Sequence, residues 1–182
     1  MTATHEPLNL APLSDAEWPE SISSIRNGFA GQLNVYRVMA HHPPLLQAWT
    51  NLRNHVVLES SLPARWREIV ILRTGKFIGS KYEWAHHVER GRAAGLTEAE
   101  IEAVATDAPA DEFTPVEKLL IRAVDVLLES FCIPHPLREA LAAHVSARNL
   151  LDLMATVGMY LTLGFIVKTF ETPIEPHLRN TV

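Results

Sequence analysis

Signals that start and stop α-helices recur at short intervals along this chain, and they constrain its fold more than any other feature. Thr97 with Glu100, and Thr114 with Glu117, have the spacing of a capping box. In a capping box a hydroxyl and a carboxylate satisfy the free N–H groups at the start of a helix. Gly95 stands where a helix C-terminus favours glycine. Between such signals, apolar residues return every three or four positions, which is the period of a helix.

The predicted helices share this apolar period and are bounded by proline, glycine or a capping residue. They cover residues 45–60, 64–77, 80–94, 97–105, 114–131 and 136–144, and a long apolar helix follows Ser146 and ends before Pro173. No segment alternates polar and apolar residues for long enough to be a convincing strand. The sequence therefore predicts an all-α bundle of about seven helices. We expect an N-terminal arm over residues 1–20 and a single helical domain over residues 21–182.

Composition narrows the class of partner. The chain has 182 residues, of which 47% are hydrophobic and 20% charged, the balance of a globular domain. Its net charge of −5 disfavours nucleic acid and anionic membranes as general partners. The N-terminus lacks the basic start and apolar core of a signal peptide. The longest uncharged run, residues 153–167, is shorter than the roughly 20 residues that span a bilayer, so we interpret it as a buried helix.

The chain contains one cysteine, Cys132, which lies in an apolar stretch. A single cysteine cannot form an intrachain disulfide, and this favours a reducing compartment such as the cytoplasm. We interpret Cys132 as a small buried hydrophobic residue.

Three acidic and basic side chains within residues 67–101 have a spacing that favours chemistry. On a helix that begins near residue 80, Glu83 and His87 lie on one face, so the carboxylate can hold the imidazole in one tautomer. On the preceding helix, Glu68 shares a face with Gly75 and Gly79, and the glycines would let the two helices approach closely. Two carboxylates that flank one imidazole form a general acid–base unit near neutral pH.

The same segment resembles the signature of the carboxymuconolactone decarboxylase and alkylhydroperoxidase D superfamily. In the peroxidase branch, a glutamate and a histidine flank a CxxC pair; here Glu68 and His87 are in register, while Ser80 and Glu83 replace the two cysteines. The decarboxylase branch looks closer, because residues 83–88 match its ExxxHV segment and residues 95–101 match its Gly-Leu-Thr-x-x-Glu-Ile element. The resemblance extends more loosely over most of residues 18–176.

This resemblance implies an alkylhydroperoxidase D-like helical bundle that forms a homo-oligomer, either a trimer or a hexamer. It implies a lyase or isomerase similar to 4-carboxymuconolactone decarboxylase, acting on a small carboxylated lactone or keto acid in the catabolism of aromatic compounds. His87 is the expected acid–base group, and Glu68 and Glu83 tune it. The electrons released by decarboxylation are delocalised into a conjugated carbonyl group, so no cofactor and no metal is expected.

Four further residues are candidates for contacts with the substrate. Ser80 stands at the first cysteine position of the peroxidase signature. Tyr82 and His86 point to a different side of the helix from His87, and either could line the same pocket or face a neighbouring subunit. Arg73 could hold a substrate carboxylate through two parallel hydrogen bonds, although a solvated arginine is the favoured interpretation.

Purely structural interpretations of these residues stay open. Ser80 and Glu83 also have the spacing of a capping box. Glu68 could be a solvated charge paired with Arg65 or Arg67, an exposed pair of little value to stability. His87 could be a core histidine that is fully hydrogen-bonded.

Other classes of function stay open as well. The chain could be a non-catalytic ligand-binding or scaffold member of the fold. A thiol-dependent peroxidase is disfavoured because both signature cysteines are replaced. Glu68, Glu83 and His87, with or without His86, could instead bind a metal ion.

Overall fold

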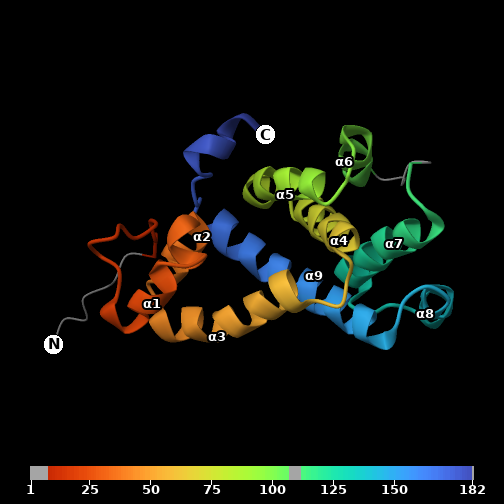
Figure 1. The fold of residues 1–182 in the computed structure, drawn as a ribbon, viewed down its shortest axis with the longest axis horizontal. Coiled ribbons are helices and arrows are strands. Elements are labelled where there is room, and N and C mark those ends of the chain that lie inside the picture. Colours follow the sequence, from red (N-terminus) through yellow and green to blue (C-terminus); the bar gives the residue numbers. More distant parts are fainter. Residues whose placement is uncertain (1–7, 107–111, 182) are drawn as a thin grey trace.

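The computed structural model describes residues 8–106 and 112–181, and in this part of the chain it is built from helices without a strand (Figure 1). The all-α prediction is therefore confirmed. Nine α-helices are present among the described residues: α1 Ser23–Arg26, α2 Asn34–Met39, α3 Pro43–Asn54, α4 Ala64–Phe77, α5 Lys81–Ala93, α6 Glu98–Val104, α7 Pro115–Ser130, α8 His135–Ala142 and α9 Ala147–Thr169.

Shorter helical turns join these elements. Three are 3-10 turns, at Glu20–Ile22, Ala30–Gln32 and Pro176–Thr181, and His55–Glu59 is a π-turn that continues α3. All seven predicted helices are present. The two additional ones, α1 and α2, are only four and six residues long, too short to show an apolar period in the sequence.

Local capping chemistry fixes several helix starts where the sequence predicts them. Thr97 and Glu100 form a complete capping box at α6, and Thr114 and Glu117 form another at α7. In each box the hydroxyl accepts from the glutamate backbone N–H, and the carboxylate accepts from the threonine backbone N–H. Ser146 caps α9 in the same reciprocal way. These bonds depend only on residues three apart, which is why sequence alone predicts them.

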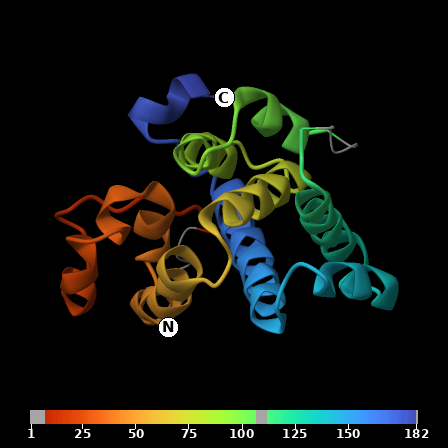
Figure 2. The same ribbon diagram turned by 45° about the vertical axis from the view of Figure 1, so that its right-hand side comes forward.

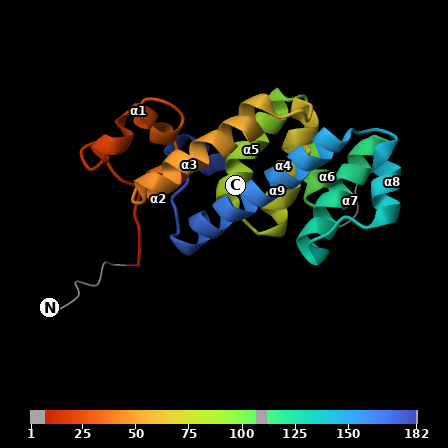
Figure 3. The same cartoon turned by 90° about the horizontal axis from the view of Figure 1, so that it is seen from below.

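Helix α4 is the hub of the fold, with its most extensive contacts to α5, α7 and α9. Helix α9 runs diagonally through the molecule, with α1–α3 on one side and α7 and α8 on the other (Figures 1 and 3). The chain then turns back after α9, and its C-terminal segment lies beside α5 (Figure 2). This return brings residues from near the C-terminus to the helix that carries His87.

The apolar run at residues 153–167 forms most of the buried side of α9, in agreement with the predicted buried helix. Leu153, Met159 and Leu163 are buried in the core. By length and hydropathy α9 could cross a membrane, but half of its most apolar window is buried within this fold, as in the core helix of a soluble protein. Its outer face still exposes Leu151 and Phe165.

The prediction for Cys132 is wrong, because its side chain is exposed. Helix α7 ends at Ser130, and Phe131 then takes a left-handed conformation with φ of 58°. This turn directs the chain away from the core before it reaches Cys132. Ile133, the next residue, returns to the core instead.

Candidate functional site

Helices α4 and α5 meet at Gly75. A Cβ atom built on Gly75 would lie 3.4 Å from the Cβ atom of Glu83, so a larger side chain here would press on the carboxylate-bearing residue. The close approach expected from the sequence is therefore present at Gly75. Gly79 contributes to the turn between the two helices instead, because its φ of 62° lies in the left-handed region that favours glycine.

The close approach brings Glu68 of α4 against His87 of α5. The Nδ1 atom of His87 lies 2.7 Å from Oε2 of Glu68, and both side chains are buried. Because a carboxylate can only accept, Nδ1 carries the proton and donates it to this bond. In the neutral imidazole, Nε2 is then the free base, and the ring is held edge-to-face against Tyr160 with 4.9 Å between ring centroids.

The Nε2 atom of His87 faces Glu83, with 3.8 Å between Nε2 and Oε2 of the carboxyl group. Glu83 is only 4% exposed, and its Oε1 atom has no hydrogen-bond partner among the described residues. Burial raises the pKa of Glu83 to about 8; Arg90 opposes this rise, and the charge of Glu175 adds to it. The carboxyl group therefore holds its proton at neutral pH.

Burial has the opposite effect on the imidazole. It lowers the pKa of His87 from its usual value, and the attraction of Glu68 for the charged ring only partly offsets this change. His87 is therefore neutral at pH 7 while Glu83 is protonated. An acid and a base face each other at the centre of the protein, and pairs with pKa values moved in this way are typical of functional sites.

Capping explains Ser80 but not the carboxylate of Glu83. The Ser80 hydroxyl accepts from the backbone N–H of Glu83 at 3.2 Å and so caps α5. At α6 and α7 the carboxylate also accepts a hydrogen bond from the backbone N–H of the capping residue. The carboxyl group of Glu83 forms no such bond with Ser80. The half of the capping interpretation that concerns the Glu83 side chain is therefore wrong.

The exposed-pair interpretation of Glu68 is also wrong, because Glu68 is only 5% exposed. The Nε atom of Arg67 lies 4.0 Å from Glu68, whereas His87 is much closer. Arg65 points elsewhere and pairs with Glu100 and Glu117. Glu68 is therefore a partner of His87 and not of a neighbouring arginine.

A small cavity of about 20 Å³ lies beside the acid–base pair. A space of this size holds about one water molecule. Its lining comes from the start of α2, from α5 and from α9: Leu33, Val35, Tyr36, Tyr82, Glu83, His86, His87, Arg90, Tyr160 and Leu163. Two predicted substrate contacts, Tyr82 and His86, thus line the same cavity as Glu83 and His87, whereas Glu68 does not line it. Ser80 does not line it.

Tyr82 and His86 are both held by Glu175, a residue that the sequence analysis missed. The Tyr82 hydroxyl donates to Oε1 of Glu175 at 2.7 Å, and Nε2 of His86 lies 2.6 Å from Oε2. Glu175 lies in an irregular segment after α9, with no helical period and no motif to mark it. No signal in the sequence could have found it, since its partners are about ninety residues away along the chain.

Arg73, like Ser80, is a predicted substrate contact that does not line the cavity. Its guanidinium group forms two hydrogen bonds with Asp125, at 2.6 and 3.1 Å, and also donates to the backbone carbonyl of Val104. It is also buried, so the solvated interpretation is wrong too. Asp125 lies on α7, so this pair joins two helices of the core. The guanidinium group is already hydrogen-bonded to Asp125 and is not free to bind a substrate carboxylate.

The described residues contain no group of three or more His, Cys, Asp and Glu side chains that is arranged to hold a metal ion. Glu68, Glu83 and His87 are close to one another, with a hydrogen bond between His87 and Glu68 and a separation of 3.8 Å between His87 and Glu83. The metal-site interpretation of these three residues is therefore not supported by their arrangement.

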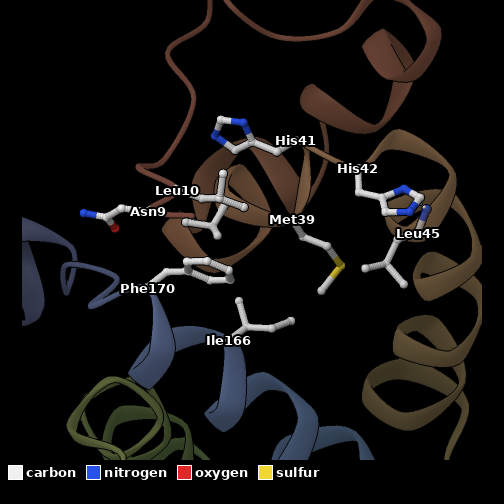
Figure 4. A pocket seen from close by; sticks show the side chains of 9 residues that line it. Asn9, Leu10, Met39, His41, His42, Leu45, Ile166 and Phe170 are labelled. Atoms are coloured by element: carbon white, nitrogen blue, oxygen red, sulfur yellow. Dashed lines mark hydrogen bonds between the residues drawn. The ribbon is translucent and has the colours of Figure 1, made fainter. Parts of the chain in front are cut away.

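A much larger pocket, of about 580 Å³, lies away from the acid–base pair (Figure 4). It opens between the N-terminal arm, α2, the start of α3 and the end of α9, and none of the predicted site residues lines it. Figure 4 shows an apolar floor with two histidines above it; the lining residues are Asn9, Leu10, Val38, Met39, His41, His42, Leu45, Ile166 and Phe170.

Comparison with known proteins gives one family match. The model of the carboxymuconolactone decarboxylase family matches residues 43–126, a range that includes Glu68, Glu83 and His87 but not Glu175. No curated protein matches the chain.

Several solved structures have a similar fold. A protein of unknown function from Agrobacterium tumefaciens, named as a candidate antioxidant defence protein AhpD, is 26% identical, with a TM-score of 0.66 over 74% of this chain and 94% of its own. A variant of the debrominase Bmp8 bound to 2,3,4-tribromopyrrole is 15% identical, with a TM-score of 0.79 over 97% of this chain and 96% of its own. An uncharacterised peroxidase-related protein from Ralstonia eutropha JMP134, with an alkylhydroperoxidase AhpD core, is 17% identical, with a TM-score of 0.79 over 96% of both chains.

Proposed function

Since the chain belongs to the carboxymuconolactone decarboxylase and alkylhydroperoxidase D superfamily, we propose that it is an acid–base catalyst of the decarboxylase type. Its proposed substrate is a small carboxylated lactone or keto acid, and its proposed reaction is that of a lyase or an isomerase. The single observation that carries this proposal is the protonated Glu83 facing the neutral Nε2 of His87 across 3.8 Å.

The chemistry of the site fits loss of carbon dioxide from such a substrate. When the bond between the ring carbon and its carboxylate breaks, the electron pair moves into the conjugated carbonyl group and leaves an enolate. Glu83, which is protonated at neutral pH, is placed to return a proton to that carbon. His87 then takes a proton from solvent at Nε2 and passes it back to Glu83, while Glu68 stabilises the imidazolium ion through Nδ1.

The same pair supports an isomerisation. The Nε2 atom of His87 can accept a proton from the carbon next to a carbonyl group, and Glu83 can deliver one to another carbon of the resulting enolate. Tyr82 and His86 line the cavity and support the proposal that they contact the substrate. The hydroxyl of Ser80 is already used in capping α5, so its contribution to substrate binding would be indirect.

Thiol chemistry of the kind implied by the resemblance to the peroxidase branch is less well supported. Ser80 and Glu83 stand in place of the signature cysteines, and Cys132, the only cysteine, is exposed after the end of α7. A serine hydroxyl cannot be oxidised and recycled as a thiolate can. Peroxide consumption sustained by a dithiol, and abolished in Cys132→Ser, would favour that activity instead.

A second candidate is a non-catalytic binding or scaffold protein, and the size of the cavity favours it. At about 20 Å³ the cavity admits about one water molecule, so a lactone can enter only if the walls move.

A direct test is a spectrophotometric assay of wild type, His87→Ala and Glu83→Gln with 4-carboxymuconolactone, and then with other carboxylated lactones and keto acids.

Catalysis through this pair predicts turnover by the wild type and a loss of at least about a hundredfold in kcat in both variants. The Cys132→Ser variant is the matched control and should retain full turnover. Unchanged turnover in His87→Ala would contradict the assignment of that residue. No turnover with any compound, together with saturable binding measured by calorimetry, would favour the non-catalytic candidate.

We also propose that the protein acts in the cytoplasm as a homo-oligomer, a trimer or a hexamer. The single exposed thiol favours a reducing compartment. Exposed apolar side chains on the outer face of α9, Leu151 and Phe165 among them, favour contact with another subunit. Sedimentation equilibrium would test this, and a monomer at micromolar concentration would contradict it.

A further inference from the structure

Glu175 gathers three hydrogen bonds in the interior, although it lies outside every helix and close to the C-terminus. It is only 5% exposed. Its Oε1 atom accepts from the backbone N–H of Asn34 at 2.7 Å and from the Tyr82 hydroxyl at 2.7 Å, and its Oε2 atom lies 2.6 Å from Nε2 of His86. A buried carboxylate with three donors holds its partners firmly, because each donor would otherwise be left unpaired.

Two of the three partners, Tyr82 and His86, line the cavity beside the acid–base pair, and Asn34 lies between the lining residues Leu33 and Val35. Tyr82 and His86 lie one turn apart on α5, with 4.7 Å between their ring centroids. The Tyr82 hydroxyl also accepts from the backbone N–H of Val35 at 3.3 Å, and Asn34 donates through its side chain to the carbonyl of Pro173 at 2.9 Å. The C-terminal segment, α5 and the first turn of α2 are thus joined at a single carboxylate.

We propose that Glu175 is a positioning residue of this site, which holds Tyr82, His86 and the start of α2 in place as the outer wall of the cavity. The importance of Glu175 for catalysis rests on the proposed function. Its hydrogen bonds to Asn34, Tyr82 and His86 are observed independently of that proposal. The residue lies outside the range matched by the family model.

The charge of Glu175 also acts on the catalytic pair. Burial opposes ionisation, but hydrogen bonds from His86, Asn34 and Tyr82 outweigh it and lower the pKa of Glu175 below its usual value. The resulting negative charge contributes to the raised pKa of Glu83, after burial itself. The other titratable or charged groups around the carboxyl group of Glu83 are Glu68 on α4, Tyr82, His86, His87 and Arg90 on α5, Tyr36 on α2 and Tyr160 on α9.

Two substitutions separate the effect of the charge of Glu175 from the effect of its side-chain length. Glu175→Gln keeps the length of the side chain and removes the charge, while Glu175→Asp keeps the charge and shortens the side chain. Glu171→Gln is the matched control, because it removes a charge from a less buried residue of the same segment. Neither readout depends on turnover, so failure of the proposed function and failure of this inference are distinguishable.

The first readout is the infrared band of the protonated carboxyl group of Glu83, assigned by its loss in Glu83→Gln. In the wild type and in Glu171→Gln, the band should titrate with a midpoint near pH 8. In Glu175→Gln the midpoint should move to lower pH, because a neighbouring negative charge is gone. A residue that only supports the fold would not move this midpoint, so an unchanged midpoint would overturn the electrostatic part of the proposal.

The second readout is hydrogen exchange at the backbone amide of Asn34, which donates to Glu175. In Glu175→Asp the shorter side chain cannot reach all three donors, and exchange of this amide should be at least about tenfold faster than in the wild type. The Glu171→Gln control should show no change. Equal exchange rates in Glu175→Asp and wild type would overturn the positioning role.

Discussion

Arg65 and Glu68 lie one turn apart on α4, and each belongs to a different cluster of buried carboxylates. The two clusters differ in the partners that their carboxylates have. Arg65 donates to Glu117 at 2.7 Å, to the carbonyl of Gly95 at 2.7 Å and to Glu100, so it joins α4 to the capping boxes of α6 and α7. Glu68 instead meets His87, which faces Glu83. We call these the arginine cluster and the histidine cluster.

The two clusters differ in whether charge is compensated. In the arginine cluster, the hydrogen bond from Arg65 lowers the pKa of Glu100, and burial of Glu117 is outweighed by its bonds to Arg65 and Thr114, which lower its pKa as well. In the histidine cluster, no lysine or arginine in the described part of the chain forms an ion pair with Glu83, and its pKa rises to about 8. A complete network stabilises a fold, whereas an incomplete one indicates a group kept for chemistry.

The largest effect is expected when the arginine cluster is broken. Arg65→Ala leaves Glu117 and Glu100 buried without their cation, and the free energy of unfolding should fall by about 3 kcal/mol. Urea denaturation measures this loss. Arg92→Ala is the control, since its pairs with Glu89 and Glu98 are exposed and should contribute little. Equal stability of the two variants would mean that the arginine cluster does not join these helices.

A second prediction concerns the pH dependence that the histidine cluster gives to stability. Between the ordinary value of 4.5 and about 8, folded Glu83 keeps a proton that the unfolded chain has lost. Its contribution to stability is therefore fully present below pH 4.5 and is lost as pH rises towards 8, by up to about 1.4 kcal/mol per pH unit. Glu83→Gln removes this slope and should gain stability relative to the wild type as pH rises.

Urea denaturation at several pH values between 5 and 8 checks this slope. Glu117→Gln is the matched control, because the pKa of Glu117 is lowered in the folded state. Its contribution is present above its ordinary pKa and is lost only in acid, so this substitution should remove no slope between pH 5 and 8. Parallel curves for wild type and Glu83→Gln would mean that Glu83 is ionised in the folded protein, contrary to the proposed acid role.

The sequence predicts the histidine cluster better than its surroundings, for a physical reason. Helical spacing places Glu83 one turn from His87, and Gly75 allows the close approach that brings Glu68 near. Both relations depend on spacing within a short segment of the chain, and both are present in the structure. The exposure of Cys132 follows from a left-handed turn at one residue, which no periodicity announces.

Long-range contacts lie further beyond sequence reasoning. Arg73 has the spacing and chemistry of a ligand for a carboxylate, but Asp125 on α7 occupies it. Glu175 has no local signal at all, yet it reaches Tyr82 and His86 because the chain turns back after α9. Partners of this kind are set by the packing of whole helices, so a pattern within one segment cannot choose among them.

The smallest predicted effect compares the helix caps at the two clusters. Ser80→Ala at α5 and Thr97→Ala at α6 each remove a hydroxyl that accepts a backbone N–H, and each should lower the free energy of unfolding by about 1 kcal/mol. Thermal or urea denaturation checks this. The Ser80 hydroxyl bonds to the backbone N–H of Glu83 rather than to its carboxyl group. The pH midpoint of Glu83 should therefore be the same in both variants, and a shift confined to Ser80→Ala would mean that the hydroxyl belongs to the acid–base site.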